Sequence, residues 1–125
     1  MSAPTKAEDW IAKAEEDLAI ALPLLRRKKL MTYGITFHAQ QCAEKYLKAL
    51  VVKQGVAPIK THDLVQVASQ CLSNGILVPI STKDLQILAD YGVRSRYPGD
   101  DPTPEEAKEA LEIAKAVRKF AKTLL

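Results

Sequence analysis

The stretch 37-FHAQQCAEKYLKALV-51 decides the fold, because its apolar residues recur at the spacing of an α-helix. Residues three or four positions apart share one face of a helix. The apolar face and the residues beside it are Ala39, Ala43, Tyr46 and Leu50, with Cys42 and Leu47. The pattern predicts a helix from about Thr32 to Gln54, ending before Gly55.

Three further segments carry helix start or stop signals. The sequence TKAE at 5–8 has capping-box spacing, so Thr5 and Glu8 can each satisfy a backbone amide of the other. The sequence THDL at 61–64 predicts a helix with Thr61 as its N-cap, and Asn74-Gly75 predicts its end. The sequence STKD at 81–84 opens a fourth helix.

The last helix begins at TPEE, 103–106, where Thr103 caps, Pro104 takes the first helical position and Glu106 completes a capping box. No segment alternates with the period of a strand. We therefore predict an all-α, five-helix antiparallel up-and-down bundle in a single domain, 1–125. The expected core contains Trp10, Leu18, Tyr46, Leu50, Leu88, Leu111 and Val117.

Composition favours a cytoplasmic protein away from membranes. The 125 residues carry a net charge of +3, which requires no nucleic-acid partner but leaves room for a local basic patch. The start of the chain lacks an apolar signal core, and no apolar run approaches the roughly 20 residues of a membrane helix. Cys42 and Cys71 lie within helical patterns, which favours free buried thiols in a reducing compartment.

General motifs predict no catalytic residue, no metal site and no cofactor. The two histidines, His38 and His62, do not form a cluster with cysteine at the spacing that a zinc site requires. The chain has no glycine-rich phosphate loop and no nucleophile elbow. Each histidine is interpreted as a polar helical residue.

Two charged segments leave two interpretations open. Gln41, Glu44 and Lys48 share one side of the second helix, either as a solvent-facing ion pair or as a polar stripe facing a groove or second subunit. The run 26-RRKK-29 follows the first helix, whose last turn Pro23 should kink or fray. It is either a solvated helix end or a nucleic-acid contact.

The stretch 89-ADYGVRSRYPGDD-101 combines two tyrosines with two arginines. Pro98 disfavours helical geometry at Tyr97, so the fourth helix should end around Arg96 and an extended segment should follow. Arg94 or Arg96 could pair internally with Asp100, Asp101 or Glu44. Alternatively, one arginine and Lys48 form the anion-binding edge of a groove, with Tyr91 or Tyr97 stacking on a base.

The chain resembles the HEPN domain family. The matching pieces, in chain order, are Trp10 with 14-AEEDLAIAL-22, 37-FHAQQCAEKYLKALV-51, 61-THDL-64, 91-YGVRSRYPGDD-101 and 105-EEAKEALEIAKAV-117. The resemblance implies a helical bundle that forms a homodimer. It also implies a minimal nucleotidyltransferase as partner, in a toxin–antitoxin-like pair. Family members that cleave RNA carry an arginine and a histidine that follows it, with four to six residues between them.

That histidine is absent here. Gly99, Asp100 and Asp101 stand where it would follow Arg94, and Asp101, Pro102 and Thr103 stand where it would follow Arg96. Aspartate titrates about two and a half pKa units below histidine and is a poor acid–base substitute. We therefore predict a subunit that binds nucleotide or nucleic acid or serves as a scaffold, without the family's ribonuclease activity. An RNA-cleaving toxin that uses His38 or His62 is the alternative, and a bundle without nucleotide function is a third.

Overall fold

The computed structural model describes residues 6–94 and 98–125, with side chains described for 6–91 and 98–125. The described residues form helices and connecting loops and contain no strand. The five-helix, all-α prediction is confirmed. The helices are α1 (Ala7–Leu24), α2 (Thr32–Lys53), α3 (Leu64–Ser73), α4 (Thr82–Arg94) and α5 (Pro104–Leu124).

The helix starts were predicted with mixed success. At α5, Thr103 and Glu106 form the predicted capping box, with Pro104 in the first turn. At α3 the predicted N-cap was wrong: Asp63, not Thr61, accepts from the amide of Val65. The Thr61 hydroxyl instead accepts from the amide of Asp63, which shifts the helix start by two residues.

The predicted box at the start of α1 depends on Thr5, which lies outside the described residues. The N-cap of α1 is Lys6, which makes no side-chain capping bond. At the other end, α1 contains Pro23 in its last turn and stops at Leu24. Both α2 and α3 end before a glycine, Gly55 and Gly75, with positive φ angles of 79° and 83°. Only glycine adopts this backbone conformation without strain.

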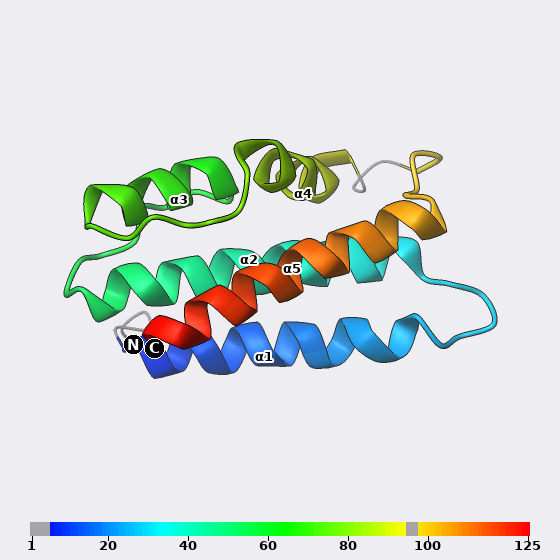
Figure 1. The fold of residues 1–125 in the computed structure, drawn as a ribbon. Helices are drawn as coiled ribbons and strands as arrows, with labels where there is room; N and C mark the ends of the chain where they lie inside the picture. Colours follow the sequence, from blue (N-terminus) through cyan, green and yellow to red (C-terminus); the bar gives the residue numbers. More distant parts are fainter. Residues whose placement is uncertain (1–5, 95–97) are drawn as a thin grey trace.

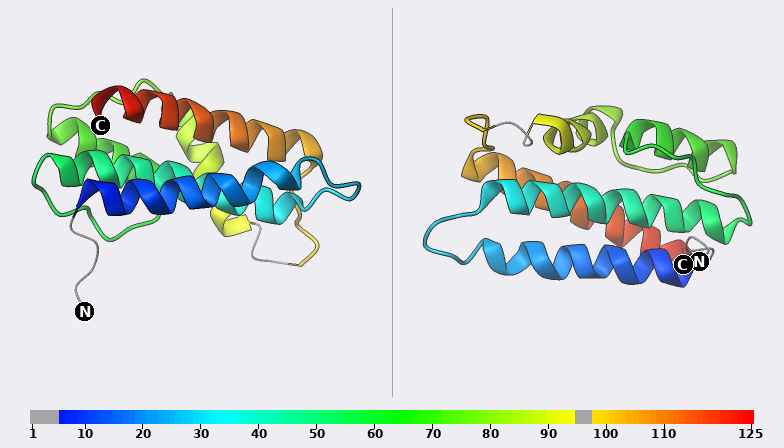
Figure 2. Two further views of the ribbon diagram at one scale, coloured as in Figure 1. Left: turned by 90° about the horizontal axis from the view of Figure 1, so that it is seen from below. Right: turned by 180° about the vertical axis from the view of Figure 1, so that it is seen from behind.

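The helices surround α2, which packs against all four others (Figure 1). α1 runs antiparallel along α2, and α5 packs against α2 with its C-terminal end at the same end of the bundle as the beginning of α1. The shorter helices α3 and α4 cover another side of α2. α4 crosses the long helices at a steep angle instead of running along them (Figure 2, left).

The core follows the predicted apolar faces with one exception. Tyr46, Leu50, Leu88, Leu111 and Val117 are at most 1% exposed, and Leu18 is 7% exposed. Trp10 was predicted to lie in the core but is only half-buried at the N-terminal end of α1. Its ring packs against a charged group, with the Lys48 Nζ 5.7 Å from the ring centroid.

Both cysteines are free and buried, as their positions in helical patterns predicted. Burial raises the pKa of Cys42 to about 12 and that of Cys71 to about 11. Thiols in such surroundings stay protonated and unreactive at neutral pH. The part of the chain that the structure describes contains no candidate membrane-spanning helix.

Candidate functional site

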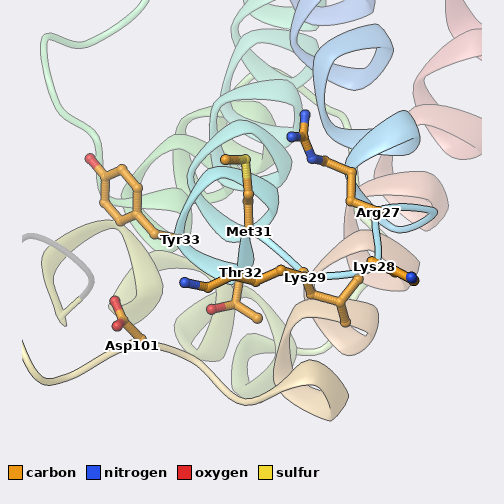
Figure 3. A pocket seen from close by; sticks show the side chains of 8 residues that line it. Arg27, Lys28, Lys29, Met31, Thr32, Tyr33 and Asp101 are labelled. Carbon is orange, nitrogen blue, oxygen red and sulfur yellow. The ribbon is translucent and has the colours of Figure 1, made fainter.

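An open pocket of about 480 Å³ lies at the turn between α1 and α2 (Figure 3). Three consecutive basic residues, Arg27, Lys28 and Lys29, contribute its positive charge. The turn continues into α2, and Asp101, from the loop before α5, reaches the same pocket from a distant part of the chain. The remaining lining residues are Leu30, Met31, Thr32 and Tyr33.

The charges of this pocket are available to a ligand. Arg27, Lys28, Lys29 and Asp101 are exposed, and none of them forms an ion pair or side-chain hydrogen bond within the part of the chain that the structure describes. α2 begins here without a side-chain cap and without an acidic residue in its first turn. The positive end of its dipole therefore adds to the field of the three cations.

The first turns of α2 also present an aromatic face. Tyr33, which is 44% exposed, stacks on Phe37 with ring centroids 5.9 Å apart and an interplanar angle of 23°. Gln41 follows one turn later on the same side of the helix and is half-buried. The spacing of four residues thus places two aromatic rings and the amide of Gln41 in one stripe along α2, which begins at the basic pocket.

Glu44 lies at the centre of a buried polar network beneath the segment that leads into α3. Its side chain is 4% exposed, and that of Lys48 is 7% exposed, with 3.0 Å between Glu44 Oε2 and Lys48 Nζ. Gln40 Nε2 and His62 Nδ1 each lie 3.0 Å from Glu44 Oε1. The interpretation as a solvent-facing ion pair was therefore wrong, because the backbone at 61–62 covers the pair.

Lys48 and Tyr91, both predicted as phosphate-site residues, lie inside the protein. The Lys48 ammonium also donates to the Thr61 carbonyl at 2.8 Å, so its hydrogen bonds are directed inward. Tyr91 is 3% exposed and lines a smaller pocket of about 220 Å³ with Asp90, Glu106 and Glu109. Three carboxylates repel a phosphate there, and the buried ring offers little surface to a base.

The other three predicted site residues fall at the edge of what is described. Arg94 provides the last residue of α4, and its side chain is not among those described. Arg96 and Tyr97 lie outside the described residues. The chain is described again from Pro98 and reaches the basic pocket at Asp101. Among the described residues, no group of three or more histidine, cysteine or acidic side chains could hold a metal ion.

Both histidines contact a carboxylate through Nδ1. His38 Nδ1 lies 2.8 Å from Asp17 Oδ1, and its side chain is 24% exposed. Lys45 binds the second oxygen of Asp17. His62, on Glu44, is 72% exposed. A carboxylate in this position orients an imidazole and leaves Nε2 as its second polar atom.

Glu15 ties three helices together at the surface of the bundle. Arg118 donates two hydrogen bonds to its carboxylate, at 2.8 and 2.9 Å, and Tyr46 donates a third at 2.6 Å. The Arg118 hydrogen bonds, more than any other contact, lower the pKa of Glu15 from 4.5 to about 2. Burial, and then the Glu15 carboxylate, raise the pKa of the Tyr46 hydroxyl.

This contact predicts a pH dependence of stability. A carboxylate with a depressed pKa in the folded state contributes its full stabilisation above pH 4.5 and loses it as the pH falls toward 2. We expect wild type to be more stable than Glu15→Gln near neutral pH, with the difference shrinking between pH 4.5 and 2. Urea unfolding at several pH values measures it. Glu16→Gln, at an exposed 3.8 Å pair, is the control and should change stability little.

Sequence reasoning missed the site that the structure brings together. The run 26-RRKK-29 was interpreted as either a solvated helix end or a nucleic-acid contact, but Tyr33 was not connected with it. Asp101 was considered as a partner for arginine or as a residue in the place of the family's histidine. A usable signal was present, because an aromatic residue follows the basic run by four positions. Asp101 is far away in sequence, and only the packing of α5 against α2 brings its loop to the pocket.

Comparison with known proteins agrees with the fold. A protein of Methanocaldococcus jannaschii named "Putative toxin MJ1304" is 27% identical, with 95% of this chain and 88% of that protein covered. The crystal structure of TT1696 from Thermus thermophilus superposes with a TM-score of 0.77 at 24% identity, covering 98% of this chain and all of that one. The model of the HEPN domain matches residues 7–124, nearly the entire bundle. The chain therefore belongs to the HEPN domain family.

Proposed function

We propose that this protein is the HEPN subunit of a toxin–antitoxin-type pair and that it binds nucleotide or nucleic acid at the α1–α2 end of its bundle. Membership of the HEPN family and the name of the M. jannaschii relative support the type of system. The observation that carries the binding role is the pocket whose three cations have no ion-pair partner among the described residues. Cations placed together without carboxylate partners favour a phosphate-bearing ligand.

We also propose Arg94 and Arg96 as phosphate-binding residues. They precede the segment 98–101, which reaches the pocket at Asp101. A guanidinium suits phosphate because its planar fork can donate two hydrogen bonds. Arg94→Ala and Arg96→Ala should weaken RNA binding while the melting temperature barely moves. If both variants instead lose several degrees of melting temperature and bind RNA as tightly as the wild type, both arginines are structural.

The partners are part of the same proposal. A homodimer would cover the part of this stripe formed by Phe37 and Gln41 and leave Tyr33 open to the pocket, because aromatic residues are enriched in interface cores. This stripe replaces the predicted one of Gln41 and Glu44, since Glu44 is buried within the subunit. A minimal nucleotidyltransferase is the expected second partner. Light scattering at tens of micromolar protein tests the dimer, and co-purification from the native host tests the enzyme partner.

RNA binding tests the central claim. The triple variant Arg27→Ala/Lys28→Ala/Lys29→Ala should bind a single-stranded RNA at least about tenfold more weakly, with a shallower dependence of affinity on salt. The control Lys60→Ala/Lys83→Ala/Lys119→Ala removes the same charge from exposed positions on other segments. Fluorescence anisotropy over a range of salt concentrations measures both. Equal affinities for the two variants would contradict the proposal.

A second candidate function is RNA cleavage with a displaced acid–base residue. The arrangement of His62 favours it, since its Nδ1 is held by buried Glu44 while the ring is 72% exposed. An oriented imidazole with an accessible nitrogen can transfer protons near neutral pH. Cleavage of RNA that persists with a chelator and disappears in His62→Ala, but not in His38→Ala, would establish it. Without cleavage by the purified protein, the binding role stands alone.

A further inference from the structure

The pocket at the α1–α2 turn has basic side chains at one side and an acidic and an aromatic side chain at the other. Figure 3 shows Arg27 and Lys28 on one side, Asp101 and Tyr33 on the other, and Lys29 between them. A pocket built for phosphate alone has no use for a carboxylate, which repels the anion. A nucleotide, however, carries a phosphate at one end and hydrogen-bond donors with an aromatic base at the other.

The size of the pocket and its surroundings favour a small ligand. Its volume of about 480 Å³ falls within the range of small-molecule sites. The basic surface does not continue as a track along α2, because Lys45 is engaged by Asp17 and Lys48 by Glu44. A long nucleic-acid backbone would need further cations in line with the first three.

We propose that this pocket binds a ribonucleoside monophosphate unit, with its phosphate in the positive field of Arg27, Lys28 and Lys29. Asp101 accepts a hydrogen bond from a ribose hydroxyl, and the base stacks on Tyr33. The stacking of Tyr33 on Phe37 supports the platform from within the protein. The unit is either a free nucleotide or the 5′-phosphorylated end of an RNA, which present the same groups. This inference rests on the proposed function and names the site and the ligand class.

Calorimetric titration with AMP, dAMP, ribose 5-phosphate and inorganic phosphate tests the assignment of each group. Wild type should bind AMP more tightly than ribose 5-phosphate, and ribose 5-phosphate more tightly than phosphate. It should also prefer AMP over dAMP, because the 2′-hydroxyl is lost in dAMP. If AMP binds no more tightly than inorganic phosphate, the pocket is not a nucleotide site and the inference fails.

Three variants separate the contributions. Lys28→Ala/Lys29→Ala should weaken AMP binding at least about tenfold, whereas the charge-matched Lys60→Ala/Lys119→Ala should not. Tyr33→Leu should weaken AMP at least about fivefold and leave ribose 5-phosphate unchanged. Asp101→Ala should bind AMP and dAMP equally well. A Tyr33→Leu variant with full AMP affinity, or an Asp101→Ala variant that still prefers AMP, overturns the orientation. Unchanged melting temperatures confirm that each variant is folded.

RNA titrations identify the source of the nucleotide. If a 5′-phosphorylated RNA binds more tightly than its 5′-hydroxyl counterpart and AMP displaces it, the ligand is an RNA end. If AMP binds and the two RNAs do not differ, the ligand is the free nucleotide; both results support the pocket. A third outcome separates the inference from the proposed function. If the Arg27/Lys28/Lys29 triple variant loses RNA binding but the wild type does not bind AMP, the inference fails and the proposed function stands.

Discussion

Replacing Leu111 by alanine should lower the free energy of unfolding by about 2–5 kcal/mol. Leu111 lies on α5, is 1% exposed and belongs to the core cluster that joins the helices. Truncation removes buried methyl groups and leaves a cavity, and the cost depends on how far the neighbours relax into it. Urea denaturation monitored by circular dichroism measures the change.

Matched controls exist on the surface. Leu72 and Leu77 are 57% and 73% exposed, so Leu72→Ala and Leu77→Ala remove the same atoms from solvent-accessible positions. Each should change stability by no more than about 0.5 kcal/mol. If Leu111→Ala behaves like these controls, α5 is not packed as described and the core assignment is incorrect.

The second large effect is expected at the buried ion pair. Glu44→Gln keeps the shape of the side chain but removes the negative charge beside Lys48, whose side chain is 7% exposed. Breaking a buried pair by removing one partner typically costs about 3–5 kcal/mol, because the other charge is left uncompensated. We therefore expect a loss in this range, observed by chemical denaturation. A loss below about 0.5 kcal/mol would show that solvent reaches the Lys48 ammonium.

A double variant without either charge separates the effect of the charge from that of the packing. Glu44→Leu/Lys48→Met removes both charges and retains apolar volume, so it should be less destabilised than Glu44→Gln. Lys48→Met alone should cost less than Glu44→Gln, because Glu44 keeps Gln40 and His62 as hydrogen-bond partners. If the double variant is the least stable of the three, the network stabilises the fold through its hydrogen bonds and not through the charge pair.

Local signals predicted those features that depend on neighbouring residues. They include the capping box of Thr103 and Glu106 and the glycines that follow α2 and α3, which depend on contacts within a few residues. The N-cap of α3 was misplaced because Thr61 and Asp63 are both capping residues two positions apart. Which of the two residues caps α3 depends on where the preceding loop crosses α2.

Burial of charge could not be predicted from spacing. Glu44 with Lys48 and Lys13 with Glu16 are both opposite-charge pairs one turn apart, yet the first is buried and the second is about two-thirds exposed. The pairing of opposite charges within one helical turn does not distinguish them. The difference arises because the backbone at Thr61 and His62 crosses over Glu44, and that crossing is a contact between segments distant in the chain.

The all-α class, the apolar faces and most helix boundaries could be predicted, because they depend on periodicity and on short-range hydrogen bonds. Only the tertiary structure decided which polar residues are accessible: it buries Lys48 and Tyr91 and leaves Arg27, Lys28 and Lys29 without ion-pair partners among the described residues. It also brings Asp101 to those cations. The physical reason is that accessibility and the convergence of distant loops depend on how the helices pack, which no local pattern encodes.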